Sequence, residues 1–332
     1  MTFRGILIEQ TVEGGTITEH RAEVRELDDD ILASDGVTVS VDYSSLNYKD
    51  AMALAGRPGI VKASPLIPGI DLVGTVELSD DPRWTPGERV ILNGAGIGEH
   101  RHGGMATRAR VSGDSLVRLP EGMSPKQAAQ IGTAGFTAML SVLALERDVA
   151  PDSGDVLVTG ASGGVGSIAI ALLAARGYRV TASTGRTEEA DYLRRLGASD
   201  VIDRTELGEP GRPLQSQRWA GAVDSVGSHT LVNVLAQTVW GGTVTACGLA
   251  QGPDLPGTVL PFILRAVTLA GVNSVEAPRP LREQAWARLA SDLDLGLLEE
   301  LADTISLEDA LDYAPRVLAG EVRGRLAVDV RH

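Results

Sequence analysis

The stretch DVLVTGASGGVGSIAIALLAARG, residues 155–177, constrains the fold of this chain more than any other segment. Strand-forming residues, Asp155 to Thr159, lead into a glycine cluster, and an apolar helical segment follows without a gap. A strand before and a helix after are the context in which a glycine-rich turn holds the pyrophosphate of a dinucleotide. The segment therefore predicts a βαβ unit that binds a dinucleotide. The competing interpretation is a glycine-rich turn without a ligand.

The three key positions of this fingerprint fall on Ala161, Gly163 and Gly166, so alanine replaces the first glycine. Glycine at 163 lets the backbone approach a pyrophosphate, and glycine at 166 lets the helix pack closely on the strand. The phosphates are then expected at the N-terminus of the helix. We predict that the whole turn contacts the cofactor, through Ala161, Ser162, Gly163, Gly164, Val165 and Gly166.

Short apolar strands alternate with helical segments from about Ser124 onward, which predicts βαβ units on a parallel sheet. The predicted strands lie in DVLVTG, YRVTAS, ASDVID, GAVDSVG and GGTVTACG. The residues before Ser124 are different, because short β-type runs broken by Gly and Pro predict a mostly antiparallel domain there. Those runs lie at residues 36–41, 72–78, 89–92 and 109–111. Further strands are expected at 269–275 and 325–330, with a helix at about 282–293.

The end of the second strand of the parallel sheet indicates which dinucleotide is bound. YRVTAS ends at Ser183, and Thr184, Gly185 and Arg186 follow. An NAD site would place an acidic residue here for the ribose 2′-hydroxyl, whereas an arginine accommodates a 2′-phosphate. Arg186 with Ser183 or Thr184 therefore predicts NADPH, and Arg204 after the third strand is a second candidate. The alternative is a solvated arginine in a loop.

Charge and composition exclude several other classes of protein. The net charge of −14 argues against a nucleic-acid partner, because phosphate binding needs clustered Lys and Arg. No apolar run approaches the roughly 20 residues that span a bilayer, and MTFRGILIEQ turns polar too soon for a secretory signal. Cys247 is the single cysteine, which fits a reducing compartment. We expect a cytoplasmic protein without a membrane partner.

The chain resembles the medium-chain dehydrogenase/reductases over nearly its whole length. SSLNYKDAMALAG, PLIPGIDLVGTV, IGTAGFTAML, VTGASGGVGS, CGLA and LPFILR together resemble the acryloyl-CoA reductase group, often labelled zinc-free quinone oxidoreductases. The resemblance implies an α/β fold in which a GroES-like, mostly antiparallel β catalytic domain (1–123 and 267–332) accompanies a doubly wound Rossmann NADPH-binding domain (124–266). It also implies a homodimer formed through the cofactor domain.

The resemblance implies that no metal takes part. Zinc-dependent relatives carry a cysteine ligand where this chain has Asn47 and a histidine ligand where it has Ile70. A zinc site needs three or four N, S or O ligands, which these positions do not supply. His100 and His102 in GEHRHGG are a possible metal pair, but an ordinary polar loop is the favoured interpretation.

Hydride transfer without a metal suits an activated alkene or a quinone. In an enoyl thioester, hydride adds to the β-carbon, so the protein must stabilise charge on the thioester oxygen and supply a proton. The resemblance places NYKD near the nicotinamide, where Tyr48 could orient or protonate the enolate and Asn47 could donate to the oxygen. Tyr48 could instead only pack on the nicotinamide or close a helix start. Lys49 and Asp50 could be catalysts, but a local surface pair is the favoured interpretation.

The remaining cofactor contacts come from the resemblance residue by residue. It places Thr133, Leu249, Ile263 and Ser274 along the nicotinamide cofactor, although each could instead be a core residue. Cys247 is expected to be a small buried residue. The implied reaction is NADPH-dependent reduction of acryloyl-CoA to propanoyl-CoA. The alternatives are an NADPH:quinone oxidoreductase and a non-catalytic NADPH-binding redox sensor.

Overall fold

The computed structural model describes all 332 residues, which form two compact units. Unit 1 contains residues 1–133, 274–290 and 295–332, and unit 2 contains residues 134–273 and 291–294. The chain therefore enters unit 2 after Thr133 and returns to unit 1 at Ser274. Both crossings lie later than the divisions predicted at 123 and 266. The helix that follows residue 124 starts inside unit 1, and the strand that follows residue 267 still belongs to unit 2.

Unit 2 is built on a six-stranded sheet in which every pair of neighbouring strands is parallel. In spatial order the strands are β10 (Ala198–Asp203), β9 (Val180–Thr184), β8 (Val156–Thr159), β11 (Trp219–Asp224), β12 (Thr238–Ala246) and β13 (Thr268–Gly271). The predicted doubly wound parallel sheet is confirmed. The strand order reverses between β8 and β11, which is the switch point where such sheets bind dinucleotides.

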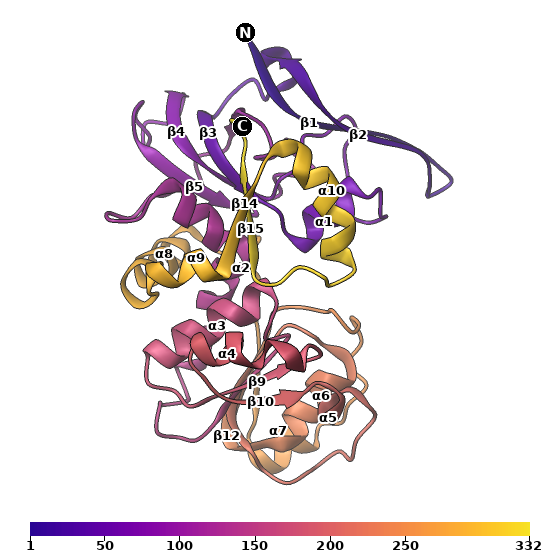
Figure 1. The fold of residues 1–332 in the computed structure, drawn as a ribbon, viewed down its shortest axis with the longest axis vertical. Helices are drawn as coiled ribbons and strands as arrows, with labels where there is room; N and C mark the ends of the chain where they lie inside the picture. Colours follow the sequence, from indigo (N-terminus) through magenta and orange to yellow (C-terminus); the bar gives the residue numbers. More distant parts are fainter. The chain divides into compact units, whose positions relative to one another are not determined.

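Helices cover both faces of this sheet, and in Figure 1 α3 and α4 lie on one face with α5 and α6 on the other. The helical segments are α3 (Gly164–Ala175), η2 (Thr187–Glu189), α4 (Ala190–Arg195), α5 (Thr205–Gly208), α6 (Ser228–Gln237) and α7 (Leu260–Arg265). All four residues of β8 are buried, as expected for a central strand covered on both sides. Leu157, Trp219, Leu235 and Val244 belong to one hydrophobic core.

Unit 1 is built on a mostly antiparallel sheet, as predicted. Its strands are β3 (Val37–Ser45), β4 (Asp71–Ser79), β5 (Arg89–Asn93), β6 (Arg108–Val111), β7 (Val117–Arg118), β14 (Ala302–Ile305) and β15 (Arg325–Asp329). The spatial order is β14-β15-β3-β4-β5-β7, with β6 also paired to β3, and only β14 and β15 run parallel. A long hairpin, β1 (Thr2–Glu13) and β2 (Thr16–Asp28), precedes the sheet and was missed in the sequence.

Short helices cover the sheet of unit 1. They are η1 (Asp29–Ile31), α1 (Tyr48–Leu54), α8 (Arg279–Asp292, whose last two residues belong to unit 2), η3 (Leu295–Leu297), α9 (Leu298–Leu301) and α10 (Leu307–Leu318). Helices α1 and α10 lie side by side in Figure 1, and Ala51, Leu54, Ala310 and Ala314 share one hydrophobic core. This packing fixes α1, the helix that begins at Tyr48.

Helix α2 (Pro125–Leu145) carries the chain from unit 1 into unit 2 and corrects one expectation. At 21 residues it is long and apolar enough to cross a bilayer, although the sequence suggested that no such segment exists. In the structure 89% of its most apolar window is buried inside the protein. Gly132, at φ 51° and ψ −160°, also breaks the helical geometry within it. These features are those of a core helix.

Candidate active site

The glycine turn after β8 has the backbone that a dinucleotide turn requires. Gly163 is the N-cap of α3 in an extended conformation, and its N–H donates to the Gly160 carbonyl at 2.9 Å. A Cβ on Gly166 would lie 2.7 Å from the Ala161 Cα and would strike the Gly160 carbonyl oxygen, so only glycine lets helix and strand approach this closely. The left-handed position of the turn is Gly160, at φ 59°, rather than Ala161. Gly160 is therefore a further residue of the turn, one that the fingerprint spacing does not mark.

Thr184 and Arg186, two of the residues predicted for the 2′-phosphate, lie at the carboxyl end of β9 beside Ser162 of the glycine turn. The Ser162 and Thr184 hydroxyls are 3.0 Å apart, and the Arg186 guanidinium donates to the Ser162 hydroxyl at 3.1 Å. The Arg186 backbone N–H also donates to the Thr184 hydroxyl at 3.0 Å. The Arg204 guanidinium lies against Gly185, because a Cβ there would be 2.6 Å from its Nε. Two cations and two hydroxyls therefore border the turn.

Three other predicted residues of unit 2 are now placed. Leu249 is 64% exposed and Ile263 is 68% exposed, so neither is a core residue. Cys247 is half-buried, and its thiol donates to the Asp224 carbonyl at 3.2 Å. Burial raises the pKa of Cys247 to about 12, which leaves the thiol protonated and unreactive at neutral pH.

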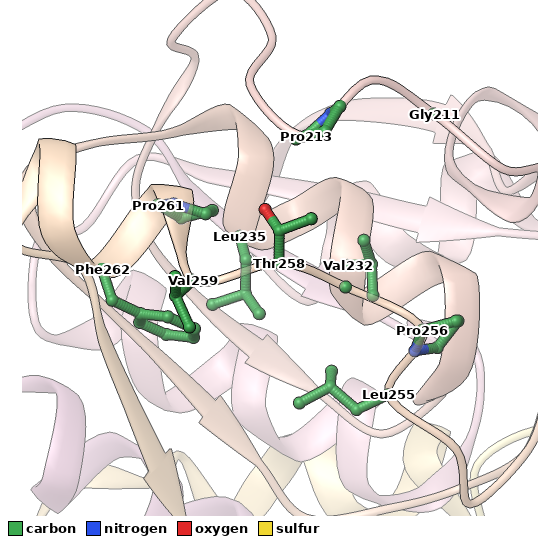
Figure 2. Close-up of a pocket in the computed structure, with 11 residues that line it drawn as sticks. Gly211, Pro213, Val232, Leu235, Leu255, Pro256, Thr258, Val259, Pro261 and Phe262 are labelled. Carbon is green, nitrogen blue, oxygen red and sulfur yellow. The ribbon is translucent and has the colours of Figure 1, made fainter.

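Unit 2 also contains a cavity of about 280 Å³ beside α6 and α7 (Figure 2). Its lining is mostly apolar and consists of Gly211, Pro213, Val232, Leu235, Leu255, Pro256, Gly257, Thr258, Val259, Pro261 and Phe262. None of the predicted cofactor residues is among them. Such a lining suits hydrocarbon rather than phosphate groups.

Unit 1 holds a buried polar cluster directly beneath the start of α1. We name it the Asp71 cluster. Its members come from five segments far apart in the sequence, and they are Ser45, Asn47, Asp50, Asp71, Asn93, Thr133 and Arg325. Because Asp50, Asp71 and Arg325 are each at least 96% buried, the cluster holds two acids and one base away from water.

Asp71, at the start of β4, accepts hydrogen bonds on both carboxylate oxygens. Oδ1 accepts from the Thr133 hydroxyl at 2.5 Å and from the Asn93 amide at 2.7 Å. Oδ2 accepts from the Asn47 amide at 2.8 Å, from the Thr133 N–H at 3.0 Å, and from the Ser45 hydroxyl. These five donors satisfy the buried carboxylate, as a buried charge requires.

Gly132 makes the contact between α2 and Asp71 possible. A Cβ at this residue would lie 2.5 Å from the Arg325 guanidinium and 2.8 Å from both the Asp71 carboxylate and the Ser45 hydroxyl. Its positive φ also lies in the left-handed region that favours glycine. The break at Gly132 thus brings Thr133 onto Asp71. The Thr133 hydroxyl, predicted to lie along the cofactor, is used in this contact.

The prediction that Lys49 and Asp50 form a surface pair is wrong. The Lys49 ammonium lies 2.8 Å from Glu99, whereas Asp50 is 1% exposed. The Asp50 carboxylate accepts from the Asn47 N–H at 2.9 Å, from the Asn47 amide at 3.0 Å, and from the Ile70 N–H at 2.9 Å. Burial, and then the nearby charge of Asp71, raise the pKa of Asp50 to about 7.

Arg325, on β15, is the single cation of the cluster. Its guanidinium donates to the Gln130 carbonyl and to the Asn47 amide oxygen, both at 3.1 Å, and to the Ser45 hydroxyl at 3.0 Å. Burial lowers the pKa of Arg325, while Asp71 and Asp50 oppose that change. One positive guanidinium therefore faces two carboxylates. Asp50 can neutralise the excess negative charge by taking up a proton.

The two predicted catalytic residues differ in their surroundings. Tyr48 is the first residue of α1 and its side chain is 59% exposed. Asn47 is 8% exposed, and its amide nitrogen lies within hydrogen-bond distance of Ser45, Asp50 and Asp71, while its oxygen accepts from Arg325. A direct bond from Asn47 to a substrate would require one of these bonds to be exchanged.

The raised pKa of Asp50 predicts a pH-dependent stability. The folded protein retains a proton on Asp50 that the unfolded chain has released, so its free energy of unfolding should fall as pH rises from about 4 to about 7. The slope from one such group is about 1.4 kcal/mol per pH unit, and above pH 7 it vanishes. Asp50→Asn should remove this component.

Urea unfolding of parent and variant at pH 5, 6, 7 and 8 checks this expectation. The difference in unfolding free energy between the two proteins should change across the first three pH values and then level off. Asp191→Asn is the matched control, because Asp191 lies on the surface of unit 2. A parent-minus-variant difference that stays constant from pH 5 to pH 8 would contradict a raised pKa.

The imidazole rings of His100 and His102 are packed against the polypeptide around them. The His102 Nδ1 accepts from the Ile67 N–H at 3.0 Å, and burial lowers the pKa of the ring. The imidazole of His100 lies against Gly96, where a Cβ would be 2.5 Å from its Nε2. The ring nitrogen of His102 that faces Ile67 is thus already in use.

A GroES-like sheet unit joined to a Rossmann unit with a glycine turn defines the class of the protein, a medium-chain dehydrogenase/reductase. Two family models match, "Alcohol dehydrogenase GroES-like domain" over residues 33–121 and "Zinc-binding dehydrogenase" over residues 164–291. The class therefore rests on sequence as well as on fold.

Two curated relatives match almost end to end. "Probable acrylyl-CoA reductase AcuI" of Escherichia coli (strain K12) is 50% identical over 99% of this chain and 100% of its own. "Acrylyl-CoA reductase AcuI" of Ruegeria pomeroyi is 47% identical over 99% of both chains. The crystal structure of E. coli K-12 YhdH with bound NADPH superposes with a TM-score of 0.94, at 50% identity over 98% of this chain and 99% of that one. The chain belongs to the acrylyl-CoA reductase family of the medium-chain dehydrogenase/reductases.

Proposed function

We propose that the protein reduces the carbon–carbon double bond of acryloyl-CoA to propanoyl-CoA with NADPH. The observation that carries the proposal is the end-to-end similarity, at 50% and 47% identity, to two relatives named for this reaction. It agrees with a solved relative that binds NADPH and with the arginine and hydroxyl groups at the end of β9. The reaction class is oxidoreduction of a CH–CH group.

The residues of unit 2 fit this cofactor. The extended backbone at Gly163 and the close packing at Gly166 leave the turn before α3 open to a pyrophosphate. Arg186 and Arg204 supply the positive charge that a 2′-phosphate needs, with Ser162 and Thr184 as hydroxyl partners. NADPH, when bound, supplies the hydride that adds to the β-carbon of the enoyl thioester.

Residues of unit 1 stabilise the negative charge that develops on the thioester oxygen and supply the proton that the α-carbon takes up. Addition at the β-carbon breaks the carbon–carbon π bond and moves its electron pair toward the thioester oxygen, which becomes an enolate. The Tyr48 hydroxyl donates a hydrogen bond to that oxygen or a proton to the α-carbon. Asn47 acts through position, because its bonds to Asp50, Asp71 and Arg325 hold the start of α1 in place. Thr133 belongs to the same support.

The test is NADPH oxidation measured against short 2-enoyl-CoAs and against small quinones. Acryloyl-CoA should give the highest kcat/KM of the panel, and propanoyl-CoA should accumulate in step with NADPH loss. Faster turnover of quinones would assign the protein as an NADPH:quinone oxidoreductase instead. Binding of NADPH with turnover of neither class would assign it as a non-catalytic redox sensor.

Arg186→Ala tests the choice of cofactor. One charge-assisted hydrogen bond contributes ~1.5–3 kcal/mol, so the KM for NADPH should rise at least ~tenfold while the KM for NADH barely changes. Arg194→Ala, an exposed arginine of α4, is the control and should change neither value. An equal loss for both cofactors would show that Arg186 supports the turn through its bonds to Ser162 rather than binding a 2′-phosphate.

We also propose that the protein is a cytoplasmic homodimer joined through unit 2. Large apolar side chains are exposed on this unit, among them Trp240, Val259, Ile263 and Leu264. Three of them, Val259, Ile263 and Leu264, are neighbours at α7, and apolar side chains gathered on a surface are typical of a protein–protein contact. Light scattering after size-exclusion chromatography should give twice the mass of the 34.8 kDa chain, and a monomer mass at micromolar concentration would contradict the dimer. The expected lack of nucleic-acid and membrane partners stays a prediction.

A further inference from the structure

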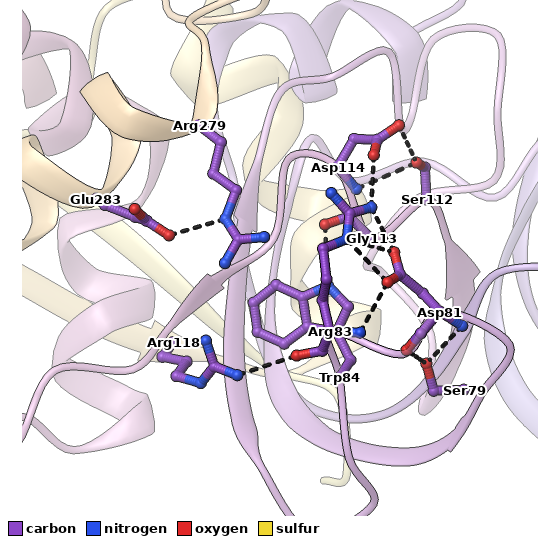
Figure 3. A network of polar contacts seen from close by, with 10 residues as sticks. All are labelled: Ser79, Asp81, Arg83, Trp84, Ser112, Gly113, Asp114, Arg118, Arg279 and Glu283. Carbon is purple, nitrogen blue, oxygen red and sulfur yellow. Dashed lines mark hydrogen bonds and ion pairs between the residues drawn. The ribbon is translucent and has the colours of Figure 1, made fainter.

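Helix α8 is held against the rest of unit 1 by the side chains on one of its faces. Arg279, Arg282 and Trp286 stand three and four residues apart, so they project from the same side of the helix. At its start, the Arg279 guanidinium lies 5.1 Å from the centre of the Trp84 ring, and Arg118 lies 4.8 Å from the same ring (Figure 3). The Trp84 indole in turn donates to the Gly113 carbonyl at 3.0 Å. The first turn of α8 is thereby held on the sheet.

The second residue of this face, Arg282, binds the segment that returns from unit 2. Its guanidinium donates to the carbonyls of Ser274, Val275 and Ala277, at 3.2, 2.8 and 2.7 Å. These carbonyls follow directly after the crossing into unit 1. A fourth bond, at 2.6 Å, goes to the carbonyl of Asn93 at the end of β5. Arg282 therefore ties the returning chain to β5.

The third residue, Trp286, reaches the side chain of the same asparagine. Its indole N–H donates to the Asn93 Oδ1 at 3.0 Å, and the Asn93 Nδ2 donates to the Asp71 Oδ1 at 2.7 Å. Trp286 and Asn93 are 1% and 2% exposed. An indole N–H can only donate, so it must meet the amide oxygen, which turns the amide nitrogen toward Asp71. The indole thus sets the orientation of Asn93.

We propose that Trp286 and Asn93 are positioning residues of the reduction, through which α8 orients Asp71 and with it the start of α1 at Tyr48. The inference rests on the proposed function. Without the indole donor, the Asn93 amide oxygen loses this partner, so the amide is held less firmly and its hydrogen bond to Asp71 is weakened. Asp71 also accepts from Asn47, the residue directly before Tyr48, so the change reaches the start of α1.

Loss of the donor should also change how the cluster titrates. The charged groups that face Asp71 are Asp50 from α1 and Arg325 from β15. The two carboxylates then have one donor fewer to stabilise their negative charge, so Asp50, whose pKa is already raised to about 7 by burial and by Asp71, should keep its proton to higher pH. The acidic limb of the pH–kcat profile should therefore move to higher pH. A residue that only filled space would lower stability without moving that limb.

Trp286→Phe is the test, because it removes the indole N–H and keeps an aromatic ring in the core. The matched control is Trp219→Phe, in which a 2% exposed indole of unit 2 donates to an amide oxygen, that of Gln237, at 3.1 Å. With acryloyl-CoA, kcat of Trp286→Phe should fall roughly two- to tenfold, the equivalent of one hydrogen bond, at an unchanged KM for NADPH. The control should keep the kcat and the pH limb of the parent.

Asn93→Ser provides a second variant and shows whether Trp286 acts through Asn93. It should move the acidic limb in the same direction, and Trp286→Phe added to it should move the limb no further. Equal pH–kcat profiles for Trp286→Phe and Trp219→Phe would overturn the inference. Shifts of the acidic limb that add in the double variant would overturn it as well.

The positioning role can be separated from the proposed function. A parent protein that reduces no enoyl-CoA would contradict the proposed function alone. The pH dependence of the unfolding free energy would then report on the cluster, and Trp286→Phe should change its slope between pH 5 and pH 8 while Trp219→Phe does not. The same slope in both variants would overturn the positioning role.

Discussion

Tyr48→Phe should lower kcat for acryloyl-CoA reduction by ~10²–10³, because it removes one donor from a developing oxyanion and costs ~2.7–4 kcal/mol. A general acid alone contributes about 10²–10⁴. The ring remains at the start of α1, so the KM for NADPH should change much less. Stopped-flow or steady-state NADPH oxidation measures both quantities. A quinone has no α-carbon to protonate, so any quinone rate should fall less than the acryloyl-CoA rate.

Tyr43→Phe is the control for this substitution. Tyr43 lies on β3 of the same unit and is partly exposed, yet it takes no part in the Asp71 cluster. Loss of the Tyr43 hydroxyl should leave kcat for acryloyl-CoA unchanged. A Tyr48→Phe variant whose kcat for acryloyl-CoA stays within threefold of the parent would leave Tyr48 as a cofactor contact only, with water delivering the α-proton.

Arg325→Met should destabilise the protein by ~3–5 kcal/mol at pH 7, because it leaves buried carboxylates without their cation. Methionine keeps most of the volume of the side chain, so the loss is mainly electrostatic. The loss of unfolding free energy should be smaller at pH 5, where Asp50 holds a proton and no longer adds a negative charge. Urea unfolding at the two pH values measures the change in unfolding free energy.

Arg179→Met is the matched control for the loss of an arginine. Arg179 pairs with Asp155 at 2.9 Å on the surface, where its side chain is 64% exposed. Surface pairs of this kind contribute about 0–1 kcal/mol. A loss for Arg325→Met that is no larger than that of the control, or that is equal at pH 5 and pH 7, would contradict a charge-balanced cluster.

The sequence was most informative where function depends on adjacent residues. The strand, turn and helix around Gly163 and Gly166 are contiguous, and the structure places them as the fingerprint requires. Arg186 could be proposed for the 2′-phosphate because it stands two residues after the end of β9. Gly160 was missed because the fingerprint spacing aligns on Ala161, whereas the backbone turns one residue earlier.

The Asp71 cluster could not be predicted from local pattern. Asp50 within NYKD has the sequence of an exposed helix start, but its buried carboxylate faces Ile70 and Asp71, which are distant in the sequence. The β1–β2 hairpin was missed for a related reason. TITEHRAEVRELD is rich in charge, and its pairing with β1 rather than its own hydrophobicity makes it a strand.

The position of a transferred deuterium tests the central claim most directly. Acryloyl-CoA is reduced with NADPH deuterated at both C4 positions, in ordinary water, and the propanoyl-CoA is examined by NMR and mass spectrometry. The account predicts one deuterium at C3 and none at C2, and one deuterium at C2 when unlabelled NADPH is used in D₂O. Propanoyl-CoA without deuterium at C3 in the first experiment, or no propanoyl-CoA at all, would contradict it.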